Sequence, residues 1–193
     1  MNKIFGIGLN KTGTNSLNKA LKILGVNSVH YPHDYTTYKE IREANYNLSV
    51  LKFNDAITDL PSAIYYKEYD ETFKNSKFIL TVRDKEKWIK SVKNQWEKNK
   101  NLFNEDLPPV NGDYKKIALF FVTALYKCHS FNEKVFLNTY ETHNENVKKH
   151  FENKANLLVI DICNGDGWEK LCPFLNIKPP KETPFPQENI GIY

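Results

Sequence analysis

The sequence predicts an α/β fold in which one parallel sheet is flanked by helices on both faces. Two observations carry this prediction. Short apolar runs alternate with stretches of helical spacing along the chain of 193 residues. The run Lys77-Phe78-Ile79-Leu80-Thr81-Val82 is almost continuously apolar or β-branched, which is typical of a strand buried on both faces of a parallel sheet. Because the chain contains no internal repeat, long linker or low-complexity segment, we expect residues 1–193 to form a single domain.

Five apolar runs are expected to form the strands. Residues 3–9 predict a buried strand that leads into a glycine-containing loop, and residues 28–31 predict a short one. The apolar, partly alternating stretch 49–56 is expected to hold the third strand. Residues 77–82 are the clearest strand, because they are nearly all apolar or β-branched, and Leu157–Ile160 is another buried strand.

Helices are expected between these strands. Residues 14–24 place leucines on one face and end at a glycine, and proline 61 stands where a helix can begin. The full set of expected helices covers residues 14–24, 38–44, 61–73, 85–99, 114–130, 132–151 and 168–175. Residues 104–113 contain two prolines and a glycine, which predicts a loop that could act as a lid over the site.

Composition excludes several classes of function. The net charge of +4 is small, and the lysines are scattered, so we expect no nucleic-acid partner. Three cysteines without paired spacing (Cys128, Cys163 and Cys172) indicate neither a disulfide framework nor a metal site. No apolar run approaches the about 18–20 residues that span a membrane, and no signal peptide is recognised. We therefore expect a cytoplasmic protein with reduced thiols, no membrane partner and no metal.

The most informative stretch is residues 8–16, Gly-Leu-Asn-Lys-Thr-Gly-Thr-Asn-Ser, which joins the first strand to the first helix. Main-chain N–H groups at a helix start bind phosphate-like anions, and Lys11 adds a positive charge. A Walker A loop needs a glycine directly before the lysine, whereas Asn10 stands there. The pattern therefore predicts an anion cradle that is not a standard Walker loop.

A second anion-binding pair follows the fourth expected strand. Arg83 comes directly after that strand, and Ser91 lies eight residues further along the next helix. Because carboxyl ends of parallel strands share one sheet edge, Arg83 should emerge beside the first loop. Arginine is suited to forked hydrogen bonds with a phosphate. The simpler alternatives are a salt bridge for Arg83 and a solvated hydroxyl for Ser91.

Together these motifs resemble the P-loop sulfotransferases, and in particular a compact subgroup of sulfotransferase-like proteins. The segment Lys11-Thr12-Gly13-Thr14-Asn15-Ser16 is similar to their 5′-phosphosulfate loop, and Arg83 with Ser91 is similar to their 3′-phosphate site. The resemblance extends over most of the chain, through residues 55–61, 78–84, Trp88, 140–147, 157–161, 167–175, 184–186 and Asn189. It implies a P-loop NTPase-like sulfotransferase fold.

The resemblance also implies a chemistry. The cofactor would be 3′-phosphoadenosine 5′-phosphosulfate, leaving adenosine 3′,5′-bisphosphate as product, without a metal. Lys11 would stabilise the leaving oxygen, and residues Thr12, Gly13, Thr14, Asn15 and Ser16 would hold the 5′-phosphate. Arg83 and Ser91 would hold the 3′-phosphate.

The acceptor, its general base and the oligomeric state are not fixed by the sequence. We expect a small-molecule or glycan acceptor with a hydroxyl or amine, in a pocket built from residues 31–56 and 104–114. Asp55, Asp59, His30 and His33 all lie near predicted strand ends, and Asp55 is the preferred base because it closes the third expected strand. Two alternatives stay open: a nucleotide or small-molecule kinase, and a nucleotide-binding protein without activity.

Overall fold

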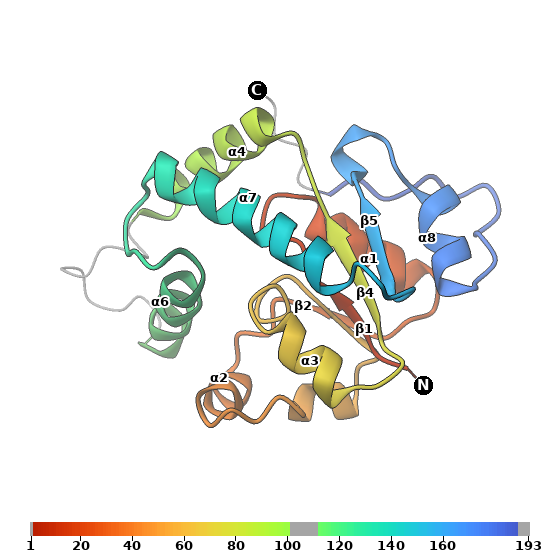
Figure 1. The fold of residues 1–193 in the computed structure, drawn as a ribbon, viewed down its shortest axis with the longest axis horizontal. Coiled ribbons are helices and arrows are strands. Elements are labelled where there is room, and N and C mark those ends of the chain that lie inside the picture. The colour runs from red at the N-terminus through yellow and green to blue at the C-terminus, as the bar shows by residue number, and fades with distance from the viewer. Residues whose placement is uncertain (1, 101–111, 189–193) are drawn as a thin grey trace.

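The computed structural model describes residues 2–100 and 112–188 and places a five-stranded sheet at the centre of the molecule (Figure 1). The strand order is β2-β3-β1-β4-β5, and every neighbouring pair is parallel. The strands are β1 (Ile4–Gly6), β2 (Ser28–His30), β3 (Ala56–Thr58), β4 (Lys77–Thr81) and β5 (Leu157–Ile160). The predicted α/β fold with a helix-flanked parallel sheet is confirmed.

Helices follow the strands in the alternation that the sequence predicts. The α-helices are α1 (Thr14–Ile23), α2 (Tyr35–Arg42), α3 (Tyr66–Thr72), α4 (Lys85–Lys98), α6 (Gly112–Tyr126), α7 (Glu133–His150) and α8 (Trp168–Leu175), with 3₁₀ turns η1 (Ser49–Lys52) and η2 (Ile162–Asn164). Three helices begin at side-chain caps: Asp34, Asp84 and Asn132 each accept a hydrogen bond from the main-chain N–H three residues later. Such caps satisfy N–H groups that the first helical turn leaves free.

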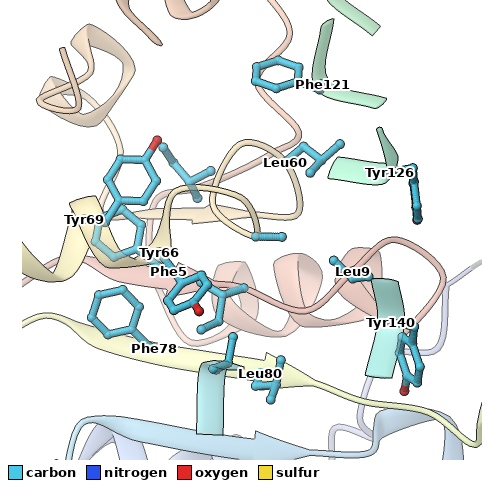
Figure 2. Close-up of a cluster of buried hydrophobic side chains, with 14 of the residues drawn as sticks. Phe5, Leu9, Leu60, Tyr66, Tyr69, Phe78, Leu80, Phe121, Tyr126 and Tyr140 are labelled. Carbon is cyan, nitrogen blue, oxygen red and sulfur yellow. The ribbon is translucent and has the colours of Figure 1, made fainter. Parts of the chain in front are cut away.

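The two faces of the sheet are buried by different helices. On one face, Ile4 and Ile79 pack with apolar residues of α1 and α8. On the other, Phe5 and Phe78 pack with residues of α2, α3, α4, α6 and α7. Figure 2 shows the centre of this second layer, where the Phe5 ring stacks on Tyr69 at 4.6 Å and on Phe78 at 5.4 Å between ring centroids. Alternate residues of one strand thus serve opposite faces, as the pleat requires.

Several expected elements differ from the structure. The strand expected over residues 3–9 is limited to Ile4–Gly6, and the helix expected over residues 114–130 ends at Tyr126. The stretch 49–56 is not a strand: it forms η1, and β3 begins only at Ala56. The Lys3 ammonium donates to the carbonyls of Leu51 and Asn54, which satisfies local acceptors that a strand would pair in a sheet. The expected helix 61–73 is also shorter, because residues 61–65 form turns and α3 starts at Tyr66.

Part of the expected loop at 104–113 lies outside the described residues. Of that range, the structure describes only 112 and 113, and these begin α6. The idea of a lid over the site therefore stays a prediction.

Candidate functional site

One cavity of about 480 Å³ opens at the carboxyl edge of the sheet. The segment after each strand contributes to its wall: Lys11 after β1, Tyr31 after β2, Asp59 after β3, Arg83 after β4 and Cys163 after β5. Ligands of open parallel sheets bind at this edge. The cavity is therefore the candidate active site.

The 8–16 loop is held in an unusual conformation by close packing. Lys11 and Gly13 adopt left-handed backbone angles, with φ of 67° and 96°. A Cβ atom on Gly8 would lie 2.0 Å from the Thr81 hydroxyl oxygen, so only glycine allows the loop to pass this close to β4. The Thr12 hydroxyl is buried and bonds both Leu9 O and Thr81 Oγ1 at 2.6 Å. These contacts hold the loop in the turn that precedes α1.

The structure separates the predicted loop residues by role. Lys11, Gly13, Thr14, Asn15 and Ser16 line the cavity. Thr12 is absent from the described lining residues, because its side chain faces the protein interior. No side chain among the described residues caps the start of α1 at Gly13. Main-chain N–H groups of the first turn of α1 are thus available to an anion in the cavity.

Arg83 is anchored from two directions. The Tyr140 hydroxyl accepts a hydrogen bond from Arg83 N at 2.8 Å and donates one to Arg83 O at 2.5 Å. The guanidinium Nη1 donates to the carbonyl oxygen of Lys11 at 3.1 Å. Arg83 therefore joins the end of β4 to the turn that carries Lys11, and its side chain lies on the cavity wall.

Aromatic residues support this arrangement. The fully buried Trp88 ring stacks on Tyr140 at 4.3 Å between centroids, and its indole N–H donates to Asn10 O at 2.9 Å. The side-chain oxygen of Asn10 accepts a bond from the Tyr126 hydroxyl at 2.8 Å, and its amide donates to Gln95. Asn10, which takes the place of the Walker glycine, thus ties the loop to α4 and α6.

Ser91 lies about two turns into α4, as expected, but its side chain is buried. It is 2% exposed on α4 and is not among the described residues that line the cavity, although Val92 beside it is. Its hydroxyl has no hydrogen-bond partner among the described residues. A buried hydroxyl usually has a partner, so this hydroxyl is open to a further hydrogen bond, although Ser91 does not line the cavity among the described residues.

The structure places the candidate general bases at different edges of the sheet. The preference for Asp55 rests on the expectation that it closes the third strand, and that premise is wrong. Asp55 precedes β3 instead of closing it, so it lies at the amino edge of the sheet, where its carboxylate is 4.0 Å from the Lys3 ammonium. Asp59 and His30 lie at the carboxyl edge and line the cavity. His33 is not among the described lining residues, and its imidazole bonds the Tyr31 carbonyl.

Asp59 is buried at 6% exposure and adopts a left-handed backbone angle, φ 71°. Its Oδ2 accepts a hydrogen bond from the Thr14 hydroxyl at 2.7 Å, and its Oδ1 accepts one from Leu60 N at 2.8 Å. The Nε2 atom of His30 lies 3.9 Å from Oδ2. Asp59 therefore sits beside the first turn of α1, on the same cavity as Lys11.

Burial shifts the pKa values of two rings beside Asp59, those of His30 and Tyr31. It lowers the pKa of His30, an effect that the Asp59 charge partly opposes, so the imidazole is neutral near pH 7. Burial also raises the pKa of Tyr31, and Tyr114 and Asp59 add to the rise. The Tyr31 hydroxyl thus stays protonated and can donate a hydrogen bond into the cavity.

Sequence reasoning did not assign three lining residues from the C-terminal third to the site. Cys163 lines the cavity directly after η2 begins, and Gln187 and Glu188 line it from the tail. The main-chain N–H of Glu188 donates to the Ser16 hydroxyl at 2.9 Å, and its carboxylate pairs with Lys19. No local pattern marks Gln187 and Glu188, because the tail reaches the cavity only through its long-range packing on α1.

The described residues, 2–100 and 112–188, contain no group of three His, Cys, Asp or Glu side chains that could hold a metal ion. Over the same two ranges, no helix combines the length and the apolar character that crossing a bilayer requires.

Comparison with known proteins agrees with the geometry. A family model described as a sulfotransferase domain matches residues 3–191. No curated protein matches the chain. Because the matched range covers nearly the whole sequence, the chain belongs to the sulfotransferase-domain family.

Proposed function

We propose that the protein transfers a sulfuryl group from 3′-phosphoadenosine 5′-phosphosulfate to a hydroxyl or amine of an acceptor. One observation carries the proposal: Lys11 and Arg83 lie on one cavity, joined by a hydrogen bond from the guanidinium to the Lys11 carbonyl. Two cations at adjacent strand ends suit a donor with two separated anionic groups. Family membership supports the transfer reaction in general.

The residues present fit this donor. The uncapped start of α1 offers main-chain N–H groups to the 5′-phosphosulfate, together with the O–H of Ser16, whose oxygen already accepts from Glu188. Arg83 would hold the 3′-phosphate at the cavity wall, and the buried Ser91 hydroxyl, which is off the described lining, would have to turn toward it to contribute. Thr12 serves by holding the loop, since its hydroxyl is taken by Leu9 and Thr81.

The proposed chemistry needs charge stabilisation and one proton acceptor. When bound, the donor supplies a sulfuryl group whose S–O bond to the phosphate breaks as the acceptor oxygen or nitrogen bonds to sulfur. Lys11 would hydrogen-bond the bridging oxygen and offset the negative charge that develops there. Asp59 would take the proton of the acceptor, because its carboxylate lines the cavity and bonds Thr14 in the first turn of α1, whereas the Glu188 carboxylate pairs with Lys19.

Calorimetry and turnover assays test the donor site. Adenosine 3′,5′-bisphosphate should bind the wild-type protein more tightly than adenosine 5′-phosphate, and Arg83→Ala should abolish this preference because it removes the 3′-phosphate contact. Lys11→Ala should lower turnover by about 10²-fold or more while changing bisphosphate affinity by much less. Lys149→Ala serves as a matched control at an exposed lysine of α7 that does not line the cavity. Equal affinity for the two nucleotides in the wild-type protein would refute the donor assignment.

Matched substitutions of two carboxylates test which residue is the general base. Asp59→Asn should lower kcat by about 10²-fold or more, because the amide cannot accept the proton. Asp55→Asn makes the same chemical change at the opposite edge of the sheet and should leave kcat unchanged. Comparable losses in both variants would exclude Asp59 as the base.

A further inference from the structure

We infer that the acceptor is an uncharged alcohol carried on a flat apolar ring system, and this inference rests on the proposed sulfotransferase function. It begins with the distribution of charge around the cavity. Among the described lining residues, Lys11, Arg83 and Glu188 surround the start of α1 and the end of β4. His30 and Asp59 form the floor between β2 and β3. The remaining wall is built from uncharged side chains.

On the β2–β3 side, that wall comes from α6 and the turn after β3, and we call it the apolar wall: Leu60, Ala118 and Val122. The lining from α4 is mixed, since the polar residues Gln95 and Asn99 accompany Val92 and Trp96. Ala118 and Val122 are four residues apart and so lie on one face of α6. Tyr126 and Phe136 also line the cavity, where the Tyr126 ring stacks on Phe136 at 3.8 Å and Trp96 of α4 meets Phe136 edge-on at 5.4 Å. Figure 2 labels Leu60 and Tyr126 among these lining residues.

The sheet topology separates this wall from the donor anchors. Arg83 follows β4, on one side of β1, whereas Tyr31 and Leu60 follow β2 and β3, on the other side. A donor that extends from the 8–16 loop to Arg83 leaves the β2–β3 side of the cavity for the acceptor. Asp59 lies between the two parts, where the acceptor hydroxyl must meet the sulfur.

Polar groups on the acceptor side are few and neutral or negative. Tyr31 interacts electrostatically with Tyr114 and Asp59, and both tyrosines line the cavity. A carboxylate in the acceptor would be repelled by Asp59 and would find no cation on this side among the described residues that line the cavity. A sugar would leave most of its hydroxyls without partners against the apolar wall, which is costly. A flat apolar skeleton with one hydroxyl avoids both the repulsion by Asp59 and the loss of hydrogen-bond partners against the apolar wall.

The test is a binding experiment on the full chain saturated with adenosine 3′,5′-bisphosphate. The probe is 2-naphthol, measured by calorimetry beside D-glucose, 4-hydroxybenzoate and tyramine. We expect 2-naphthol to bind about tenfold or more tightly than the other three. Ala118→Leu should weaken 2-naphthol binding by about tenfold or more, since the added side chain fills the wall, without changing bisphosphate affinity.

Ala124→Leu is the matched control, because Ala124 is half-buried on the same helix and absent from the described lining. Where Ala118→Leu does not fold, Val122→Phe fills the same face of α6 one turn later. Comparable binding of any of the other three probes, or unchanged 2-naphthol affinity in a folded wall variant, would overturn the inference.

A transfer assay with 3′-phosphoadenosine 5′-phosphosulfate distinguishes a failure of this inference from a failure of the proposed function. If 2-naphthol binds and the wall variants weaken it but no sulfate ester forms, the apolar acceptor subsite is supported and the sulfotransferase proposal fails. If glucose or tyramine is sulfated with the higher kcat/KM, the function is supported and the acceptor inference is wrong.

Discussion

The hydroxyl of Tyr140 should contribute more to stability than any other single hydroxyl near the site, and Tyr140→Phe tests this. The hydroxyl both accepts from Arg83 N and donates to Arg83 O. The ring itself is buried and stacks on Trp88. Replacement by phenylalanine keeps the ring and its packing and removes only the two hydrogen bonds.

The expected loss follows from those two bonds. Each hydrogen bond contributes about 0.5–1.5 kcal/mol, and a buried main-chain group left without a partner costs about 1–3 kcal/mol. Because the Arg83 main chain is partly buried, we expect the free energy of unfolding to fall by about 2–3 kcal/mol. For a chain of this length, that corresponds to a drop in Tm of about 4–12 °C.

Tyr126→Phe is the matched control. It removes one hydroxyl from an equally buried, stacked tyrosine, and that hydroxyl makes a single hydrogen bond to Asn10. Urea denaturation should therefore show a loss of about 1 kcal/mol for Tyr126→Phe and about twice that for Tyr140→Phe. Equal losses in the two variants would refute the argument that Tyr140 holds the Arg83 main chain from both sides.

The remaining predictions concern the loop and a buried histidine. Gly8→Ala should cost more than about 3 kcal/mol in urea denaturation, because its Cβ would meet Thr81 at 2.0 Å. Gly25→Ala, which meets no atom within 4 Å but has φ of 80°, should cost only about 1 kcal/mol; similar losses would contradict the packing argument. Burial lowers the pKa of His143 to about 4. Below about pH 6.5 the unfolded chain binds a proton at this histidine while the folded chain does not. The free energy of unfolding is therefore unaffected by this group above about pH 6.5 and falls by up to about 3 kcal/mol as the pH drops toward 4. His143→Gln should flatten that part of the pH–stability curve, and an unchanged slope would show that the group does not titrate as described.

Family membership bears on the reaction, whereas the geometry of the site bears on the acceptor. The family match covers nearly the whole chain and supports a transferase of sulfuryl groups. The proposed acceptor selectivity depends on the apolar wall, which the family match does not describe. Assays of bisphosphate binding and of acceptor binding therefore test separate parts of the proposal.

The sequence alone was sufficient for features that depend on local pattern. Alternating apolar runs and helical stretches predicted the parallel sheet and most of its helices, because burial on both faces requires continuous apolar strands. The glycines, Lys11 and the hydroxyls of the 8–16 loop predicted an anion cradle at a helix start. Arg83 was placed beside it because both follow strands of one parallel sheet.

Only the tertiary structure decided which residues face the cavity. Asp55 and Asp59 are four residues apart, yet β3 runs between them, so they end at opposite edges of the sheet. Thr12 and Thr14 are neighbours in the loop, yet one hydroxyl turns to Thr81 and the other to Asp59. The strand boundary at Ala56 and the left-handed turn at Lys11 depend on contacts between segments far apart in sequence. Local residue patterns predict which elements form, but such long-range packing determines the direction in which each functional side chain points.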